Sequence, residues 1–435
     1  MSNEIVRISN IARQYKRVDT VMYALNKENL KQSAMKIAGN KAVGIDNTTK
    51  KEYVENLNCN IEDLIIRMRK MAYKPKAVRR VYIPKPGSDR KRPLGIPAFE
   101  DKIVQDGMTQ VLNAIYEPMF KEFSFGFRPE RSCHQAIAYL DKMLHRERTN
   151  FVVDLDIKGF FDNIDHEWLI KFLEYRIADK VYIRYIRRFL KSGILEQGKL
   201  LKSDKGTPQG GIISPVLGNI YLHFVLDDWF EKVVAKETKG YGGMVRYADD
   251  SVACFEYKEE AEKYLRSVKK RLAKFGLEVS EEKTKILEIG RYAQRNRKIR
   301  GEKKPETFDF LGFTHYCSKG PKGQFRVKRK TSKKKFRAKV QEMKEWLNKR
   351  MHCKVSETIK LLNIKLVGYY RYYGITDNTN SIRSFYEITV NMFYRVLNRR
   401  SQKNRCGYLE YYEKIEKQIV KPKIYVDILK ISCNM

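Results

Sequence analysis

The chain has 435 residues, enough for two or three domains with their own hydrophobic cores. It carries 88 Lys and Arg residues against 52 Asp and Glu, and the net charge of +36 indicates a polyanionic partner, most simply nucleic acid. Its seven scattered cysteines and the lack of a long apolar run argue against a disulfide scaffold, a zinc site and a membrane protein. No apolar signal region opens the sequence, so we expect a soluble cytoplasmic protein.

The first 75 residues are charged and follow a helical apolar period, which predicts an N-terminal extension built from helices. Apolar side chains recur at helix spacing over residues 57–72, so this stretch is expected to be an amphipathic helix. A turn is expected before it at residues 39–47, because Asn47 tolerates the positive φ that such a turn needs.

Residues 81–97 combine two short apolar strands with a basic, glycine-containing turn, which predicts a hairpin that can fold over an anion. A helix is expected at residues 103–115. Ser132 is expected to cap a further helix that runs to about residue 145.

A strand that carries carboxylates is expected at residues 151–157. Apolar residues alternate with others there, which puts Asp154 and Asp156 on one face of the strand. Asp165 is expected to cap the following helix. His166 has no Cys or His neighbour at metal spacing, so we expect a structural role for it.

Residues 205–215 read Lys-Gly-Thr-Pro-Gln-Gly-Gly-Ile-Ile-Ser-Pro, a glycine-rich loop whose backbone can approach a ligand closely. Ser214 is expected to cap, and Pro215 to start, a helix that runs to residue 226.

Two short apolar runs flank Tyr247-Ala248-Asp249-Asp250, which predicts a β-hairpin with both aspartates at its tip. Adjacent carboxylates repel each other unless a cation neutralises them, and oxygen-only ligands favour Mg²⁺. Laid beside this hairpin, the strand with Asp156 would gather three carboxylates at one site, as two-metal phosphoryl transfer requires. For the hairpin taken alone, a solvated Asp-Asp turn is the alternative.

Residues 258–275 are expected to form an amphipathic helix that Gly276 ends. Short strands are expected at residues 277–279 and 286–287. Together with the earlier strand and hairpin, this strand–helix–hairpin–helix–strand order predicts a ferredoxin-like sheet.

The chain turns sharply basic from residue 326 and continues into three amphipathic helices, around residues 333–347, 361–374 and 385–397. Helices with basic outer faces would suit a domain that grips a nucleic-acid duplex by its phosphates.

The strand with Asp156, the Pro208-Gln209-Gly210 loop and the Tyr-Ala-Asp-Asp hairpin resemble motifs A, B and C of reverse transcriptases, in the same order. Residues 125–137, Phe-Gly-Phe-Arg-Pro-Glu-Arg-Ser-Cys-His-Gln-Ala-Ile, narrow the resemblance to bacterial group II intron reverse transcriptases and maturases. It spans roughly residues 10–428 and implies an α+β right-hand polymerase with a ferredoxin-like palm, fingers and an α-helical thumb.

The implied domains are an N-terminal extension at 1–75, fingers at 76–150, a palm with finger insertions at 151–318, and a thumb or maturase region at 319–435. Because no Cys/His cluster follows the thumb region, we expect this chain to lack the DNA endonuclease domain of some relatives.

The resemblance also implies roles for single residues. Asp156, Asp249 and Asp250 are expected to be catalytic and, with Ile157, to hold the metal ions. The expected nucleotide-binding residues are Lys85, Arg92, Phe161, Gln209 and Lys283. The expected nucleic-acid-binding residues are Arg128, Arg131, Gly210, Gly312, Lys328, Arg329, Lys333 and Arg337. Phe161 either faces the sugar or packs in the core, and Lys283 either protonates pyrophosphate or contacts phosphate.

The implied reaction is attack of a primer 3′-OH on the α-phosphate of a dNTP, templated by RNA, with two Mg²⁺ ions or substituting Mn²⁺. The implied partners are template and intron RNA, a DNA primer or target, and dNTPs, without a membrane; the oligomeric state, a dimer included, stays open. Three settings remain: an intron-encoded enzyme that also assists splicing and retrohoming, a splicing-only maturase, and a domesticated enzyme of phage defence or spacer acquisition. The intact aspartates and glycine-rich loop count against the second.

Overall fold

The computed structural model describes residues 2–84, 91–196, 198–201, 204–207, 210–400 and 407–434. Its α-helices are α1 (Asn3–Gln14), α2 (Lys27–Lys36), α3 (Lys50–Glu55), α4 (Leu57–Arg69), α5 (Phe99–Tyr116), α6 (Cys133–Arg146), α7 (Phe160–Asn163), α8 (His166–Glu174), α9 (Lys180–Leu190), α10 (Ser214–Leu222), α11 (Ala235–Glu237), α12 (Lys258–Lys274), α13 (Ala293–Ile299), α14 (Lys333–Lys349), α15 (Val355–Tyr373), α16 (Thr379–Asn398), α17 (Tyr408–Lys414) and α18 (Ile428–Cys433).

The strands are β1 (Val78–Pro84), β2 (Lys91–Ile96), β3 (Phe151–Asp156), β4 (Ile194–Glu196), β5 (Lys199–Leu201), β6 (Gly242–Tyr247), β7 (Asp250–Phe255), β8 (Lys285–Glu288), β9 (Phe308–Phe310), β10 (Phe313–Lys319) and β11 (Phe325–Thr331). Two short 3-10 helices, η1 (Met22–Ala24) and η4 (Glu416–Gln418), and two π-helical stretches, η2 (His223–Asp227) and η3 (Phe230–Val234), complete the elements.

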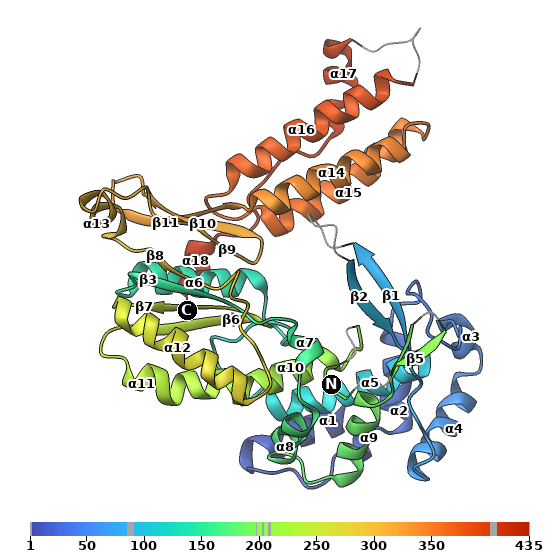
Figure 1. The fold of residues 1–435 in the computed structure, drawn as a ribbon. Coiled ribbons are helices and arrows are strands. Elements are labelled where there is room, and N and C mark those ends of the chain that lie inside the picture. The colour runs from blue at the N-terminus through green and yellow to red at the C-terminus, as the bar shows by residue number, and fades with distance from the viewer. Residues whose placement is uncertain are drawn as a thin grey trace.

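The central sheet is antiparallel with the strand order β6-β7-β3-β8. The helical run α10–α11 and helix α12 cover one face of it, and α6 covers the other (Figure 1). The chain order strand–helix–hairpin–helix–strand is the one predicted. Residues 277–279 do not form the predicted strand, because only Val279 pairs, in an isolated bridge with Ile157. Strand β8 alone is therefore the fourth strand.

A second sheet, ordered β2-β1-β4-β5, lies beside the N-terminal helices (Figure 1). The predicted hairpin is present as β1 and β2, and β4 joins β1 in parallel. Helix α4 confirms the expected amphipathic helix and buries Ile61, Leu64 and Met68. Asn47 has the expected positive φ, 55°. One hydrophobic core extends from Ile5 of α1 into the central sheet, so the N-terminal helices and this sheet pack as one body.

A third sheet, β11-β10-β9, connects the central sheet to three helices, α14, α15 and α16, that project away from it (Figure 1). These are the three amphipathic helices predicted from the sequence. Residues 325–331 form a strand that the sequence analysis did not predict. The chain then returns along these helices, Val426 pairs with Ile375, and α18 packs on α6. The C-terminal segment thus ties the three helices to the central sheet.

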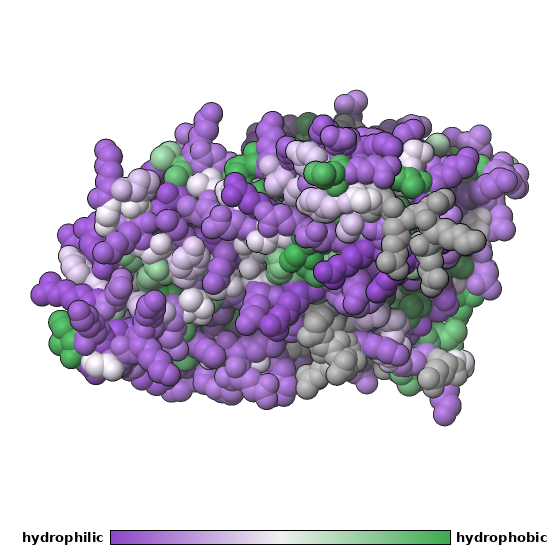
Figure 2. All heavy atoms as spheres, turned by 90° about the horizontal axis from the view of Figure 1, so that it is seen from above, coloured by the Kyte–Doolittle hydropathy of each residue, from purple (hydrophilic) through white to green (hydrophobic). Residues whose placement is uncertain are grey.

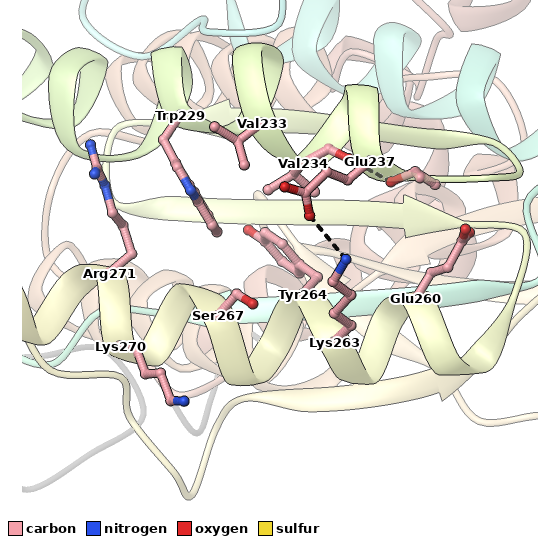
Figure 3. A pocket seen from close by; sticks show the side chains of 11 residues that line it. Trp229, Val233, Val234, Glu237, Glu260, Lys263, Tyr264, Ser267, Lys270 and Arg271 are labelled. Carbon is pink, nitrogen blue, oxygen red and sulfur yellow. Dashed lines mark hydrogen bonds and ion pairs between the residues drawn. The ribbon is translucent and has the colours of Figure 1, made fainter.

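The helix after the glycine-rich loop is longer than predicted. Its N-cap is Ile213 rather than Ser214, and no side chain caps it there. The helix passes through η2 and η3 and ends in α11. Between η3 and α12 lies a groove of about 400 Å³, crossed by a 2.9 Å ion pair from Lys263 to Glu237 (Figure 3).

Seen from above, the surface is mostly hydrophilic and its apolar side chains are scattered (Figure 2). This pattern agrees with the net charge of +36. Among the helices that the structure describes, none combines the length and apolar character needed to cross a membrane.

Candidate active site

The carboxylates singled out by the sequence meet where β3 ends and the β6–β7 hairpin turns. Asp156, the last residue of β3, pairs with Asp250, the first residue of β7. Tyr247 pairs with Asp250 across the hairpin, which leaves Ala248 and Asp249 as its two turn residues. The prediction that both aspartates lie at the tip is therefore corrected, because only Asp249 does.

Burial and mutual repulsion disfavour the charged forms of these carboxylates. Burial and the charge of Asp156 raise the pKa of Asp249. Loss of hydration, followed by the charges of Asp249 and Asp156, raises the pKa of Asp250 to about 6. Asp154 shares the face of β3 as predicted, and burial together with the charge of Asp250 raises its pKa to about 7.

Lys283 supplies a positive charge to this cluster. Its Nζ donates to both carboxylate oxygens of Asp156, at 2.9 and 2.8 Å. The lysine side chain is 58% exposed, so it is free to turn toward solvent or a phosphate. Lys283 thus lies within hydrogen-bonding reach of the carboxylate site.

The donor atoms fit hard divalent cations, because carboxylate oxygens are the ligands that Mg²⁺ prefers. The raised pKa values reflect burial first and then a mutual repulsion that a cation would relieve. Over the described ranges, however, no three His, Cys, Asp or Glu side chains gather as a ready-made metal site. Ile157 is expected to contribute only its carbonyl group. Two main-chain hydrogen bonds flank Ile157: the Ser280 N–H donates to the Asp156 carbonyl, and the Lys158 N–H donates to the Glu278 carbonyl. Neither of these bonds uses the Ile157 carbonyl.

Two residues of the β1–β2 hairpin region, Lys85 and Arg92, are expected to bind the nucleotide. Lys85 lies outside the described residues, and Arg92 lies within them. Arg92 is exposed opposite Ile83 on β1. Its positive charge opposes the burial-driven rise in the pKa of Asp249. The hairpin therefore brings a guanidinium into the electrostatic field of the carboxylate site.

Two glycines of the glycine-rich loop lie close to the backbone of other segments of the protein. A Cβ on Gly206 would lie 2.8 Å from the Phe161 carbonyl oxygen, and one on Gly210 would lie 2.4 Å from the Gly95 carbonyl oxygen. Both glycines also have positive φ. Phe161 packs edge-to-face on Phe160, with ring centres 5.0 Å apart, yet stays half-buried. Gln209 lies outside the described residues.

The structure corrects the role expected for Arg128. Its side chain is 3% exposed, pairs with Glu117 at 2.7 Å, and donates to the carbonyl groups of Lys121 and Ser124. A guanidinium held in this way is not presented to nucleic acid. Arg131 is half-buried over the Phe125 ring and remains a candidate.

Arg329 is corrected for the same reason. It is 1% exposed and pairs with Asp141 at 2.7 Å and with Asp377 at 3.0 Å, so it links α6 to the α15–α16 connection. Lys328, its neighbour on β11, is half-buried, and its binding to nucleic acid stays a prediction. Gly312 has φ 80° and, with Leu311 at 49°, forms the β9–β10 turn.

Lys333 and Arg337, on the exposed face of α14, line one groove of about 1040 Å³ between the third sheet and α16. The other cations and polar groups that line this groove include Lys330, Lys334, Asn380 and Ser381. Basic side chains at its wall and hydroxyl and amide groups opposite them are suited to a phosphate backbone.

His166 makes a structural contact, as expected, and His134 makes one of the same kind. The Nε2 of His166 lies 2.6 Å from the Gly206 carbonyl oxygen, and that of His134 lies 2.8 Å from the Tyr372 carbonyl oxygen. Asp165 and Ser132 cap α8 and α6 as predicted.

Sequence reasoning missed the residues that support the turn from behind. Arg246, on β6, is fully buried and pairs with Asp227. Gly126 approaches the turn so closely that a Cβ on it would lie 2.2 Å from the Ala248 nitrogen. A charged residue in the otherwise apolar strand before Tyr247 is the signal that could have identified Arg246.

Comparison with known proteins identifies the class to which this site and fold belong. Residues 83–315, more than half of the chain, match the family described as Reverse transcriptase (RNA-dependent DNA polymerase), and the chain belongs to this family.

The chain is 38% identical over 243 residues to the Group II intron-encoded protein LtrA of Lactococcus lactis subsp. cremoris, a match that covers 54% of this chain and 40% of that protein. It is 37% identical over 183 residues to Protein YkfC of Escherichia coli (strain K12), covering 41% of this chain and 48% of that one. Nuclear intron maturase 4, mitochondrial, of Arabidopsis thaliana is 30% identical over 134 residues, covering 30% and 16% of the two chains. The matches thus span less than half of these relatives.

Proposed function

We propose that this chain is a right-hand polymerase of the group II intron type, which copies RNA into DNA and assists the splicing and retrohoming of its intron. The observation that carries the proposal is the pairing of Asp156 with Asp250 beside the Asp249 turn, in a member of the reverse transcriptase family. The similarity to LtrA and to an intron maturase supports the intron setting.

In this proposal the central sheet is a ferredoxin-like palm, the β2-β1-β4-β5 sheet belongs to the fingers, and α14 to α16 form the thumb. The palm would thus occupy residues 151–318, preceded by the 1–75 extension and the 76–150 fingers and followed by the 319–435 thumb. The antiparallel order β6-β7-β3-β8, with helices connecting β3 to the hairpin and the hairpin to β8, supports the palm assignment.

The proposed reaction joins the 3′-oxygen of a DNA primer to the α-phosphorus of a dNTP and releases pyrophosphate, with an RNA template selecting the base. Asp156, Asp249, Asp250 and the Ile157 carbonyl would hold two Mg²⁺ ions, for which Mn²⁺ could substitute. Bound there, such ions lower the pKa of the primer hydroxyl and offset charge on the leaving pyrophosphate.

Positive side chains around these carboxylates would bind the triphosphate. Arg92 is suited to a bidentate phosphate contact, and its charge already reaches Asp249. Lys283 could move its hydrogen bond from the Asp156 carboxylate to a phosphate oxygen, because its Nζ lies at the carboxylate and its side chain is largely exposed. Lys85 and Gln209 complete the proposed nucleotide-binding set, with Phe161 toward the sugar.

The basic groove that includes Lys333 and Arg337 would bind the primer–template duplex or intron RNA through phosphates. Arg131, Lys328, Gly210 and Gly312 complete the nucleic-acid contacts that we propose. Because this contribution is electrostatic and independent of base sequence, it should weaken steeply as salt concentration rises.

Primer extension tests the proposal. The full chain is incubated with an RNA template annealed to a DNA primer, dNTPs and Mg²⁺, beside the Asp249→Ala variant and an Asp63→Ala control that removes an exposed carboxylate on α4. We expect extension by the parent and the control, and none by Asp249→Ala, which should still bind RNA. Extension by Asp249→Ala would contradict the metal assignment. No extension by any protein, with RNA binding intact, would instead favour a splicing-only maturase.

A further inference from the structure

We propose that Arg246 is a positioning residue whose buried guanidinium holds the Ala248–Asp249 turn in its working conformation. The inference concerns a residue that the proposed reaction has not used, and it rests on the proposed polymerase function for its kinetic test. Arg246 follows the apolar residues of β6 and directly precedes Tyr247, and its side chain is 0% exposed.

The turn requires support because Ala248 has φ 57°, a left-handed conformation that residues other than glycine rarely adopt. A two-residue hairpin turn with positive φ at its first position usually has glycine there. The neighbouring strands must therefore hold Ala248 in place. Asp249, the next residue, carries the carboxylate that depends on this conformation.

All five N–H donors of the Arg246 guanidinium have partners. Nη1 donates to the Ala248 carbonyl at 2.8 Å and to the Asn219 Oδ1 at 3.1 Å. Nη2 donates to the Ser124 Oγ at 2.8 Å and to Asp227, and Nε donates to the other Asp227 oxygen at 2.6 Å. A planar group fixed at five points has one orientation, so the Ala248 carbonyl is held in one place.

Gly126 also packs closely against the turn. Its missing side chain lets the backbone at Ala248 come close, since a Cβ there would lie 2.2 Å from the Ala248 nitrogen. Asn219 links the two contacts, because its Nδ2 donates to the Gly126 carbonyl at 2.6 Å while its Oδ1 accepts from Arg246. The turn is therefore held both by the guanidinium and by the close approach of Gly126, and one asparagine bonds to both residues.

The π-helical stretch η2 explains how one helix supplies both Asn219 and Asp227. In a regular α-helix, residues seven apart lie within about 20° of one another around the axis, whereas residues eight apart diverge by about 80°. Asn219 and Asp227 are eight apart, yet both bond to one guanidinium. Within η2 the Asp228 N–H donates to the His223 carbonyl, five residues back, which accommodates an additional residue in the turn. The widened turn thereby brings Asp227 toward the face that Asn219 occupies.

A lysine at position 246 would keep the positive charge but could not reproduce this arrangement, because its three donors radiate from one nitrogen. It could pair with Asp227, yet it could not also span Ser124 and the Ala248 carbonyl. The Arg246→Lys variant therefore separates charge balance from positioning. Arg329→Lys is the matched control, since Arg329 is also a fully buried arginine and lies away from the turn.

The experiment measures single-nucleotide incorporation over a range of dNTP concentrations up to saturation, on an RNA template annealed to a DNA primer. For Arg246→Lys we expect kcat to fall by about 100-fold, the loss typical of a displaced catalytic group. The KM for dNTP should change less, within about threefold, because the phosphate contacts remain. Arg329→Lys should keep kcat within about threefold of the parent even if its melting temperature falls equally. Equal kcat values for the two variants would overturn the proposal.

A second readout does not depend on polymerisation. Mn²⁺ binding, followed by electron paramagnetic resonance, should weaken by about 10-fold or more in Arg246→Lys and stay near the parent in Arg329→Lys. If the parent binds Mn²⁺ but does not extend primers, the polymerase proposal fails while this readout still decides the role of Arg246. Unchanged Mn²⁺ affinity in Arg246→Lys would overturn that role.

Should Arg246→Lys not fold, Asn219→Ala decides the matter, because it removes the shared link without leaving a buried charge unpaired. We then expect a loss of kcat of about 10-fold, smaller than for a displaced arginine. A parental kcat and Mn²⁺ affinity in Asn219→Ala would overturn the proposal.

Discussion

Two fully buried arginines lie at two different parts of the molecule, and their surroundings differ. Arg246, behind the Ala248–Asp249 turn, uses all five donors. Arg329, between α6 and the α15–α16 connection, directs Nη2 at both Asp141 and Asp377. Among the described residues its Nε and Nη1 have no hydrogen-bond partner. A fully bonded guanidinium specifies one geometry, whereas a partly bonded one leaves room for another.

This difference agrees with what each region would have to do in a polymerase. Carboxylates that act on a reacting phosphate must be held in one arrangement, since small displacements are costly in rate. A thumb that grips a duplex must accommodate different positions of that duplex. We therefore expect the Ala248–Asp249 turn to tolerate substitution less well than the connection between α6 and the helices α14 to α16.

Removing the acidic partner from each network should have the largest effect. Asp227→Ala leaves the Arg246 charge buried and unpaired, so we expect a loss of about 3–5 kcal/mol in the free energy of unfolding. Asp377→Ala leaves Arg329 its pairing with Asp141, so the expected loss is smaller, about 1.5–3 kcal/mol. Urea unfolding of both variants measures the two values. A larger loss for Asp377→Ala would reverse the comparison.

A methyl group at Gly126 should disturb the turn directly. Gly126→Ala places a Cβ against the Ala248 nitrogen, and we expect it to cost about 1–3 kcal/mol of stability and to slow nucleotide incorporation. Gly368→Ala, in α15, is the control, because its Cβ would meet nothing within 4 Å. The control should gain about 0.5–1 kcal/mol. Parental incorporation by Gly126→Ala would show that the close approach is not needed.

Low pH should destabilise the region where β10 and β11 lie beside α6. Burial, and then the charge of Arg329, lowers the pKa of His315 to about 3, whereas an unfolded histidine titrates near 6.5. Below pH 6.5 the unfolded chain therefore binds a proton that the folded chain does not, and stability falls as the pH falls toward 3. His315 alone should cost about 2 kcal/mol at pH 5 relative to pH 8.

The test is to compare the pH dependence of unfolding in the parent and in His315→Phe. The replacement should remove this part of the acid-side loss. His145, at the same connection, also faces Asp141, so His145→Phe serves as a control for a second histidine of this network. An unchanged pH slope in His315→Phe would rule out the assigned cause.

The smallest effect is expected at Ala248 itself. Ala248→Gly relieves the left-handed strain but loses conformational entropy, and the difference should leave the protein about 1 kcal/mol more stable or unchanged. Incorporation should stay near the parental rate, because Arg246 still holds the carbonyl at this position. Thermal unfolding and the incorporation assay measure the two outcomes. A marked loss of stability would mean that Ala248 is not strained.

The motifs and most elements could be predicted from the sequence because their signals are local. The capping box at Ser132, the positive φ at Asn47 and the hairpin around Asp249 depend on neighbours within a few residues. Locality also explains why the chain order of the elements of the central sheet was predicted correctly.

Burial of charge could not be predicted in this way. Arg128 and Arg329 were expected at nucleic acid because they lie among other basic residues, yet acidic partners elsewhere in the chain bury them. Arg246 bonds to Ser124, 122 residues earlier in the chain, and only the folded arrangement brings them together. The π-helical stretch that aligns Asp227 likewise leaves no signal that the helical period of the sequence reveals.

A double-variant cycle on single-nucleotide incorporation tests most directly whether the Arg246 network acts as one unit. It compares the parent, Arg246→Lys, Asn219→Ala and the combined variant, and repeats the cycle with Arg329→Lys in place of Asn219→Ala. Residues of one network couple, whereas distant residues add. We predict that the double variant with Arg246→Lys and Asn219→Ala incorporates nucleotide about as slowly as Arg246→Lys alone. In the second cycle, the fold losses of Arg246→Lys and Arg329→Lys should multiply. If the fold losses of Arg246→Lys and Asn219→Ala also multiplied, the two residues would not act as one unit.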